Sequence, residues 1–317
     1  MANYNIEDVY KAIYKINNYF GEIKRSGITI DRTDGLIRKY CQYGNKSGYG
    51  NCRDYLEKAS SGVINLLITL KDKNGLEYDK LAEYAILWLR YKLNQKSPYN
   101  STKLNDFYTK YVEKNKYYDE KIKGNGSPTY KEIIDKKKDL MDMNIKEMSK
   151  FNYPFSILVI LYNEIKNNKL DCKKYLSYPE NFANKFKELN NDSSITGNTS
   201  YRKLLSTLSY DYNNLKNKYD NKNSCNFPPL SELNSQKSFT QNSLEGSGQT
   251  LGETLKVTSS SSSISTTLIP ALSTFSVIPV FLGIAYKYSL FGVDKLFQRQ
   301  YLRKKLKKIT KKMKLNI

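Results

Sequence analysis

IEDVYKAIYKINNYF, residues 6–20, carries the pattern that decides the fold. Its apolar side chains recur at steps of three and four residues, at Ile6, Val9, Ile13, Ile16 and Phe20. That spacing places them on one face of an α-helix. Glu7 and Asp8 lie in the first turn, where the positive end of the helix dipole favours negative charge. The segment therefore predicts an amphipathic helix with one buried face.

The same spacing continues along the chain to about residue 230. Further helices are expected over Leu56–Leu70, Leu81–Leu93, Leu104–Val112, Tyr130–Met148, Ile157–Ile165, Tyr178–Leu189 and Tyr201–Tyr219. No stretch sustains the two-residue alternation that is typical of a half-buried strand. The expectation is an all-α globular domain over residues 1–230, which is long enough to bury a core.

Residues 231–263 have a different composition, dominated by Ser, Gln, Asn, Gly and Thr. Such a segment has too few apolar side chains to offset the entropy lost on ordering. We therefore expect residues 231–263 to form a disordered, Ser-rich stalk between the helical domain and the segment that begins at residue 264.

ISTTLIPALSTFSVIPVFLGIAY, residues 264–286, holds no charged side chain. A bilayer core of about 30 Å needs roughly 20 helical residues, so this segment predicts a single transmembrane helix. A buried core helix is the alternative. The Lys- and Arg-rich segment 287–317, which follows at once, favours the membrane anchor.

The charges on either side of the anchor predict its orientation. Because basic segments stay in the cytosol, the tail 287–317 is expected there and the helical domain on the opposite side. The first twenty residues lack the apolar core of a signal peptide, so the anchor would have to act as its own signal. A tail-anchored protein with its large domain in the cytosol is the alternative.

Four cysteines, Cys41, Cys52, Cys172 and Cys225, all lie in the helical domain. An even number in a domain outside the cytosol favours disulfides. Four cysteines allow three connectivities, of which Cys41 with Cys52 and Cys172 with Cys225 is one. Buried, reduced thiols are the alternative. A zinc site is disfavoured, because the chain has no CxxC spacing and no histidine.

The absence of histidine also removes most catalytic arrangements, since serine and cysteine nucleophiles usually need an imidazole base. GNKSGYG, residues 44–50, lacks the glycine before lysine that a phosphate-binding loop requires. We predict no enzyme, no catalytic residue, no cofactor and no metal. About half of the net charge of +21 belongs to the tail, and the lysines of the large domain are spread along its helices and mixed with acids, so no nucleic-acid interface is expected. The lysines of the domain are interpreted as solvated and its 28 tyrosines as partly buried filler.

The tail predicts a second contact with the membrane. Leu302, Leu306, Ile309 and Met313 fall on one helical stripe. The remaining face carries Arg303, Lys304, Lys305, Lys307, Lys308, Lys311 and Lys312. This is the pattern of a basic amphipathic helix that binds anionic lipid. A simple stop-transfer signal is the alternative.

Four stretches together resemble one known family. They are YAILWLRYKLNQK (84–96), YKEIIDKKKDLMDM (130–143), YRKLLSTLSYDYNNLKNKY (201–219) and FLGIAYKYSLFGVDKLFQRQYLRKKLKKITKKMK (281–314). The chain is similar over nearly its whole length to the Plasmodium interspersed repeat (PIR) proteins, a variant multigene family of malaria parasites. That pattern has further cysteines where this chain has Val159 and Tyr219, which leaves the number of disulfides open.

The resemblance implies a helical ectodomain at the infected red-cell surface, the parasitophorous vacuole or another exported membrane. It implies a role in antigenic variation, immune evasion or host-cell adhesion, with a host receptor or an antibody as partner. The contact surface is expected in loops 41–52, 94–103, 119–129 and 190–200. The alternative is an internal-membrane protein that acts in trafficking or host-cell remodelling through its basic tail. The oligomeric state stays open.

Overall fold

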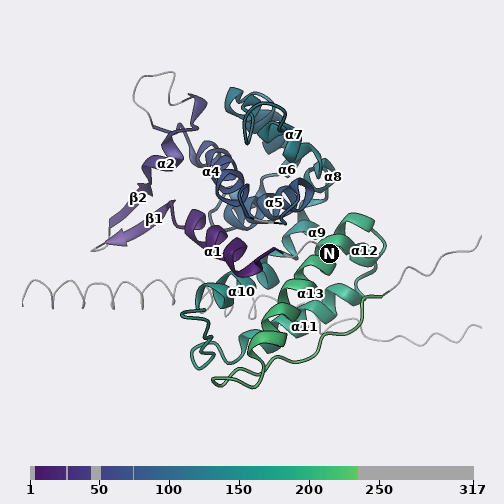
Figure 1. Cartoon of the computed structure of the whole chain (residues 1–317). Helices are drawn as coiled ribbons and strands as arrows, with labels where there is room; N and C mark the ends of the chain where they lie inside the picture. Colours follow the sequence, from purple (N-terminus) through teal and green to yellow (C-terminus); the bar gives the residue numbers. More distant parts are fainter. Residues whose placement is uncertain (1–3, 26–27, 44–50, 74, 235–317) are drawn as a thin grey trace, which may run out of the picture. The chain divides into compact units, whose positions relative to one another are not determined.

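A computed structural model describes residues 4–25, 28–43, 51–73 and 75–234. Within these ranges the chain is mainly helical, with one hairpin of two strands (Figure 1). The helices are α1 (Ile6–Asn17), α2 (Gly35–Arg38), α4 (Tyr55–Leu70), α5 (Tyr78–Asn94), α6 (Leu104–Phe107), α7 (Tyr130–Asp135), α8 (Lys138–Met141), α9 (Ile145–Ser149), α10 (Asn152–Asn163), α11 (Tyr178–Asn191), α12 (Ser193–Thr196) and α13 (Thr199–Tyr219). Short turns are η1 (Tyr99–Ser101), η2 (Tyr108–Val112) and η3 (Lys116–Asp119), and the strands are β1 (Phe20–Arg25) and β2 (Ile28–Thr33).

Helix α1 forms where residues 6–20 predict it, but it ends before Phe20. The side chain of Asn5 caps its first turn by accepting from the N–H of Glu7. At the other end, the buried Lys92 of α5 donates to the carbonyl oxygens of Asn17 and Phe20, each over 2.7 Å. A buried ammonium thus binds one carbonyl group that the end of α1 leaves open and one at the start of β1. The interpretation of the domain's lysines as solvated is wrong at this position.

Helices α4 and α5 pack against each other at the centre of the core. Gly62 of α4 lies directly against Trp88 of α5, because an added Cβ would be 2.3 Å from Cη2 of that ring. Trp88 is fully buried, so its ring has no space to move away from a larger residue. The glycine therefore lets the two helices meet.

A second group of helices, α11 to α13, adjoins α10. Figure 1 shows α11, α12 and α13 beside one another, and α10 packs against α1, α5, α11 and α13. Helix α10 can join the two groups because most of its side chains are apolar and buried. The core is therefore continuous from α4 through α5 and α10 to α13.

The hairpin β1–β2 differs from the all-α expectation. The strands are antiparallel, with Phe20 opposite Thr33 and Arg25 opposite Ile28. The pattern was missed because all of β2 except Thr33 is exposed, so no buried face imposes an alternation of apolar and polar residues. Apart from this hairpin, the elements of the described residues are helices.

The helix expected over Tyr130–Met148 is wrong as a single element, because the chain forms α7, α8 and α9 instead. The break falls at Lys137, whose backbone is not helical. Its ammonium reaches 3.5 Å from a carboxylate oxygen of Glu83, a buried residue of α5. Lys137, which was expected on the surface of one long helix, thus points inward and forms an ion pair with Glu83. Similarly, Leu104–Val112 consists of α6 and the π-turn η2.

None of the helices in the described ranges combines the length and the apolar character that crossing a bilayer requires. The predicted anchor 264–286 and tail 287–317 lie outside the described residues, as does the expected stalk from residue 235 onward. Residues 231–234 still contact the helical domain. Asn190 of α11 donates to the carbonyl of Glu232 over 2.6 Å and accepts from the N–H of Asn234 over 3.0 Å.

Candidate functional site: the segment closed by Cys41 and Cys52

A disulfide joins Cys41, which follows α2, to Cys52, which precedes α4, with their Cα atoms 5.0 Å apart. Its sulfur atoms lie against the end of α2, where Sγ of Cys41 is 3.3 Å from the carbonyl oxygen of Ile37. The same oxygen accepts from the hydroxyl of Ser61 on α4. The bond therefore brings both ends of the intervening segment to one place on the helical body. Residues 44–50 of that segment lie outside the described residues.

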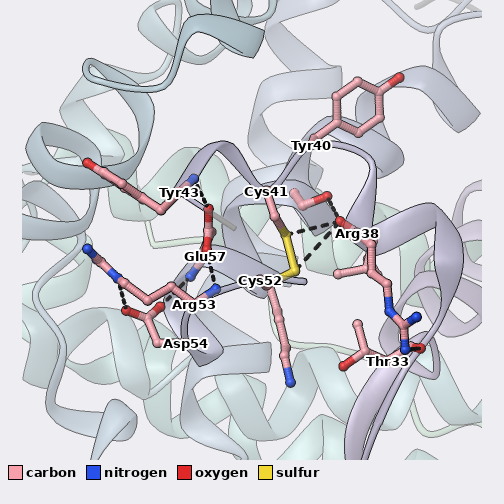
Figure 2. The surroundings of a disulfide bond; sticks show 12 residues. Thr33, Arg38, Tyr40, Cys41, Tyr43, Cys52, Arg53, Asp54 and Glu57 are labelled. Carbon is pink, nitrogen blue, oxygen red and sulfur yellow. Dashed lines mark hydrogen bonds and ion pairs between the residues drawn. A yellow bond between two sulfur atoms is a disulfide. The ribbon is translucent and has the colours of Figure 1, made fainter. Parts of the chain in front are cut away.

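Glu57 holds both ends of the segment a second time. This buried side chain, in the first turn of α4, accepts from the backbone N–H of Tyr43 over 2.5 Å and from that of Arg53. Figure 2 shows the carboxylate between these two nitrogen atoms, beside the disulfide. Since hydrogen bonds to an ionised acceptor are the stronger class, one carboxylate clamps the two chain ends.

Polar and aromatic side chains lie beside the clamp (Figure 2). The guanidinium of Arg53 lies 4.3 Å from the centre of the Tyr43 ring, and its Nε is 3.2 Å from Oδ2 of Asp54. The Tyr111 hydroxyl donates to the same carboxylate over 3.0 Å. Burial raises the pKa of Tyr111 to about 12, so the phenol remains a proton donor at neutral pH.

The other side of the segment is joined to the chain after η2. Gln42 donates to the carbonyl of Lys114 over 2.9 Å and accepts from the N–H of Lys116 over 2.6 Å. The ring of Tyr40 meets that of Tyr117 edge to face. The two ends of the closed segment are thus fixed by covalent, ionic and aromatic contacts together.

A second disulfide joins Cys172 to Cys225, 53 residues apart in sequence. It ties the chain after α10 to the chain after α13. Backbone hydrogen bonds run beside it, from Cys172 N–H to the carbonyl of Asn223 and from Asn221 N–H to the carbonyl of Cys225. Both Asn residues adopt positive φ, which asparagine tolerates better than most residues. The structure thus pairs the four cysteines in one of the three connectivities that they allow.

A buried acid, Asp211, joins several helices of the domain. Asp211 of α13 has no exposed surface. Its carboxylate accepts from the hydroxyl of Tyr10 over 2.7 Å and from that of Tyr84 over 3.0 Å. The hydroxyl of Tyr162 donates to the backbone carbonyl of the same residue over 2.7 Å. Side chains from α1, α5 and α10 thus converge on one residue of α13.

Burial raises the pKa of the Asp211 carboxyl to about 7, although the two phenol donors act in the opposite direction. Burial also raises the pKa values of Tyr10 and Tyr84 well above the ordinary value. These phenols therefore stay protonated and can donate to Asp211 in either of its charge states. The arrangement can hold a proton near neutral pH, and its visible role is to join four helices.

Sequence reasoning missed both Glu57 and Asp211. Asp54 and Glu57 form the D-x-x-E spacing of a helix start, and Asp54 does accept from the N–H of Glu57 over 2.8 Å. Asp211 stands on the apolar stripe of α13, between the buried Leu208 and Leu215. The sequence signal that could have identified Asp211 is a carboxylate at a position where the helical spacing predicts an apolar, buried residue. The tyrosines around it are specific hydrogen-bond donors, so the interpretation as filler is wrong for them.

No group of three or more potential metal ligands is found within the described residues. The candidate lipid contacts lie outside those residues. They are Arg303, Lys304, Lys305, Lys307, Lys308, Lys311 and Lys312.

Comparison with known proteins finds similarity to a family model and to solved structures. The family model described as "Plasmodium variant antigen protein Cir/Yir/Bir" matches residues 10–287. Among solved structures, this chain is similar to one titled "Structure of a Plasmodium PIR protein ectodomain", with 32% sequence identity and a TM-score of 0.54. That match covers 71% of this chain and 96% of the other. No curated protein matches.

Proposed function

The chain belongs to the Plasmodium variant antigen family Cir/Yir/Bir, and we propose that its helical domain is displayed outside the cytosol, in antigenic variation, immune evasion or host-cell adhesion. The proposed partner is a host receptor or an antibody. The proposed role is that of a binding surface and not of an enzyme. The observation that carries this proposal is the segment closed by Cys41 and Cys52, whose ends are clamped by Glu57.

Such a construction suits a variable surface. The disulfide and the Glu57 carboxylate fix the ends of the segment on helices that belong to the continuous core. In this proposal the sequence between Cys41 and Cys52 varies, while the buried face of α4 keeps its packing. Two disulfides also favour an oxidising compartment over the cytosol.

Surface labelling tests the display proposal. Antibodies against residues 4–234 are applied to intact, unpermeabilised infected red cells, before and after treatment with trypsin. We expect labelling that trypsin removes. Labelling that appears only after permeabilisation would contradict display on the cell surface. An antibody against residues 287–317 is the internal control, because the tail is expected to stay inaccessible until the membrane is opened.

The spacing of charges in the tail supports a second proposal, that residues 287–317 lie on an anionic membrane surface next to an anchor at 264–286. Each Lys or Arg near an anionic leaflet contributes about 1 kcal/mol. The proposed alternative role, in trafficking or host-cell remodelling, would act through this face. The spacing alone also suits a stop-transfer signal.

Replacing Lys304, Lys305, Lys307 and Lys308 by Gln distinguishes a lipid-binding tail from a simple stop-transfer signal. The tail contact predicts weaker binding of the tail peptide to vesicles that contain phosphatidylserine, and an altered location of the chain in infected cells. Unchanged binding and unchanged location would leave only the stop-transfer role. Neutral phosphatidylcholine vesicles are the control, because the charges should have no effect there.

A further inference from the structure

The hairpin β1–β2 has two unlike faces. Opposite residues of an antiparallel pair share a face, so Glu22 and Asp31 lie on one and Ile23 and Ile30 on the other. The charged face is turned toward the helices, because Glu22 is 2.8 Å from the ammonium of Lys96 and Asp31 pairs with Lys58. The apolar face is turned away from them.

Two isoleucines of β2 are left largely in solvent. Ile28 is 67% exposed and Ile30 is 46% exposed. Figure 1 shows the hairpin at the outer side of α1 and α2, reaching away from the helices. The outward face of β2 is therefore an exposed apolar strip that ends at Arg32, which is also exposed.

The free edge of β2 offers backbone groups as well. The N–H of Asp34 donates to the carbonyl of Tyr19 over 2.7 Å, which marks these two as a hydrogen-bonded pair. Hydrogen-bonded and non-bonded pairs alternate along an antiparallel ladder. Thr29 and Asp31 therefore direct their N–H and C=O groups away from β1. Within the described residues, no backbone hydrogen bond to these groups is found.

Exposed edges are normally protected by proline, by lysine or by covering elements, because they pair readily with other chains. The sequence of β2, ITIDRT, contains neither residue. We propose that β2 pairs antiparallel with β2 of a second copy of this chain, with Ile30 opposite the partner's Ile30. The two hairpins then form one four-stranded sheet around a twofold axis.

Charge and hydrogen bonding select this register. Since Thr29 and Asp31 carry the outward groups, the bonded pairs must join these residues. Placing Asp31 opposite the partner's Asp31 would oppose like charges, which is unfavourable. Placing Thr29 opposite the partner's Thr29 would set Asp31 and Arg32 opposite positions that precede the partner's β2. These two residues would then have no strand residue to pair with.

Centring the pair on Ile30 avoids both problems. Thr29 then lies opposite the partner's Asp31, so its hydroxyl can donate to that carboxylate. Ile28 lies opposite the partner's Arg32, whose aliphatic stem can cover it. The isoleucine strips of the two copies become continuous on one face. The strand is therefore complementary to itself, which is why a second copy is the partner proposed. A contact of this size belongs to the weak class, so pairing should depend on concentration.

Cysteine cross-linking of the full chain in mild detergent tests both the partner and the register. In a non-hydrogen-bonded antiparallel pair, opposite Cα atoms lie about 4.5 Å apart, within disulfide range. The Ile30→Cys variant should therefore form a covalent dimer on mild oxidation, seen on a non-reducing gel. Ile28→Cys is the matched control. It lies on the same face and is more exposed, but in this register the two copies of position 28 are on the order of 13 Å apart.

The proposal requires several-fold more dimer for Ile30→Cys than for Ile28→Cys or for Leu176→Cys, a 63% exposed position after α10. Equal or lower dimer yield at position 30 would overturn it. Mapping of the native disulfides by mass spectrometry verifies that each variant folds. Independently, light scattering of the unmodified chain should give a mass that rises with concentration, and Ile30→Lys should abolish that rise. A monomer at all concentrations would also overturn the proposal.

Discussion

The hydroxyl of Tyr10 donates a hydrogen bond over 2.7 Å to the buried carboxylate of Asp211, joining the first and the last helix of the described domain. The two residues are 201 positions apart in sequence. Tyr84 and Tyr162 bring α5 and α10 to the same residue. The packing of four helices thus depends on a group whose charge changes with pH.

The first prediction concerns that pH dependence. Asp211 has a pKa of about 7 in the folded domain, above the 3.8 of an exposed aspartate. Its contribution to stability is therefore present in full below pH 3.8 and is lost as pH rises through 7. Between pH 5 and pH 7 this one group should reduce the free energy of unfolding by roughly 2 kcal/mol. Urea unfolding, followed by the fluorescence of Trp88, the single tryptophan, measures it.

The Asp211→Asn variant isolates that contribution, because the amide does not titrate. The other ionisable groups near Asp211 are Lys80, Glu83 and Tyr4, and they remain in the variant. The difference in unfolding free energy between the unmodified chain and Asp211→Asn should therefore shrink or reverse from pH 5 to pH 8. A difference that is constant over this range would show that Asp211 does not titrate there.

The second prediction concerns the clamp. Glu57→Gln leaves one of the two backbone N–H groups, of Tyr43 or of Arg53, facing an amide nitrogen, so that one group loses its acceptor while the other keeps the amide oxygen. An unsatisfied buried donor costs about 1–3 kcal/mol, so the free energy of unfolding should fall by that amount. Glu113→Gln, at an exposed position after η2, should change it by less than about 0.5 kcal/mol. Equal effects of the two substitutions would mean that the clamp adds nothing.

The third prediction compares the disulfides. In the chain-entropy account, a cross-link stabilises more when it closes a longer stretch of chain. Replacing Cys172 and Cys225 by Ala should cost about 4 kcal/mol, since 53 residues separate them. Replacing Cys41 and Cys52, which are 11 residues apart, should cost about 3 kcal/mol. The reverse order in urea unfolding would point to native-state contacts, and not chain entropy, as the dominant effect.

The fourth prediction concerns the contact of α4 with α5. Gly62→Ala would place a methyl group against the buried ring of Trp88 and should destabilise the domain by about 1–3 kcal/mol. Gly35→Ala is the control, because nothing lies within 4 Å of an added Cβ there. Thermal unfolding compares the two. The account of the helix contact fails if both variants melt at the temperature of the unmodified chain.

The helical content could be read from the sequence because buried faces impose a spacing of three and four residues, as in α1 and α13. The hairpin could not be predicted, because β2 has no buried face and its isoleucines are exposed, so no alternation of apolar and polar residues marks the strand. The break at Lys137 could not be predicted either, because the partner of its ammonium, Glu83, lies on another helix. The cysteine positions indicated the closed segment, but Glu57 is identified only once Tyr43 and Arg53 are seen together in space.

The central claim is that a disulfide-bonded helical domain is displayed outside the cytosol. Intact infected red cells are labelled with a membrane-impermeant biotin reagent, and the biotinylated chain is mapped by mass spectrometry without reduction. The account predicts labelled lysines within residues 4–234 and two linked peptide pairs, Cys41 with Cys52 and Cys172 with Cys225. A chain that is labelled only after permeabilisation, with all four cysteines as free thiols, would contradict it.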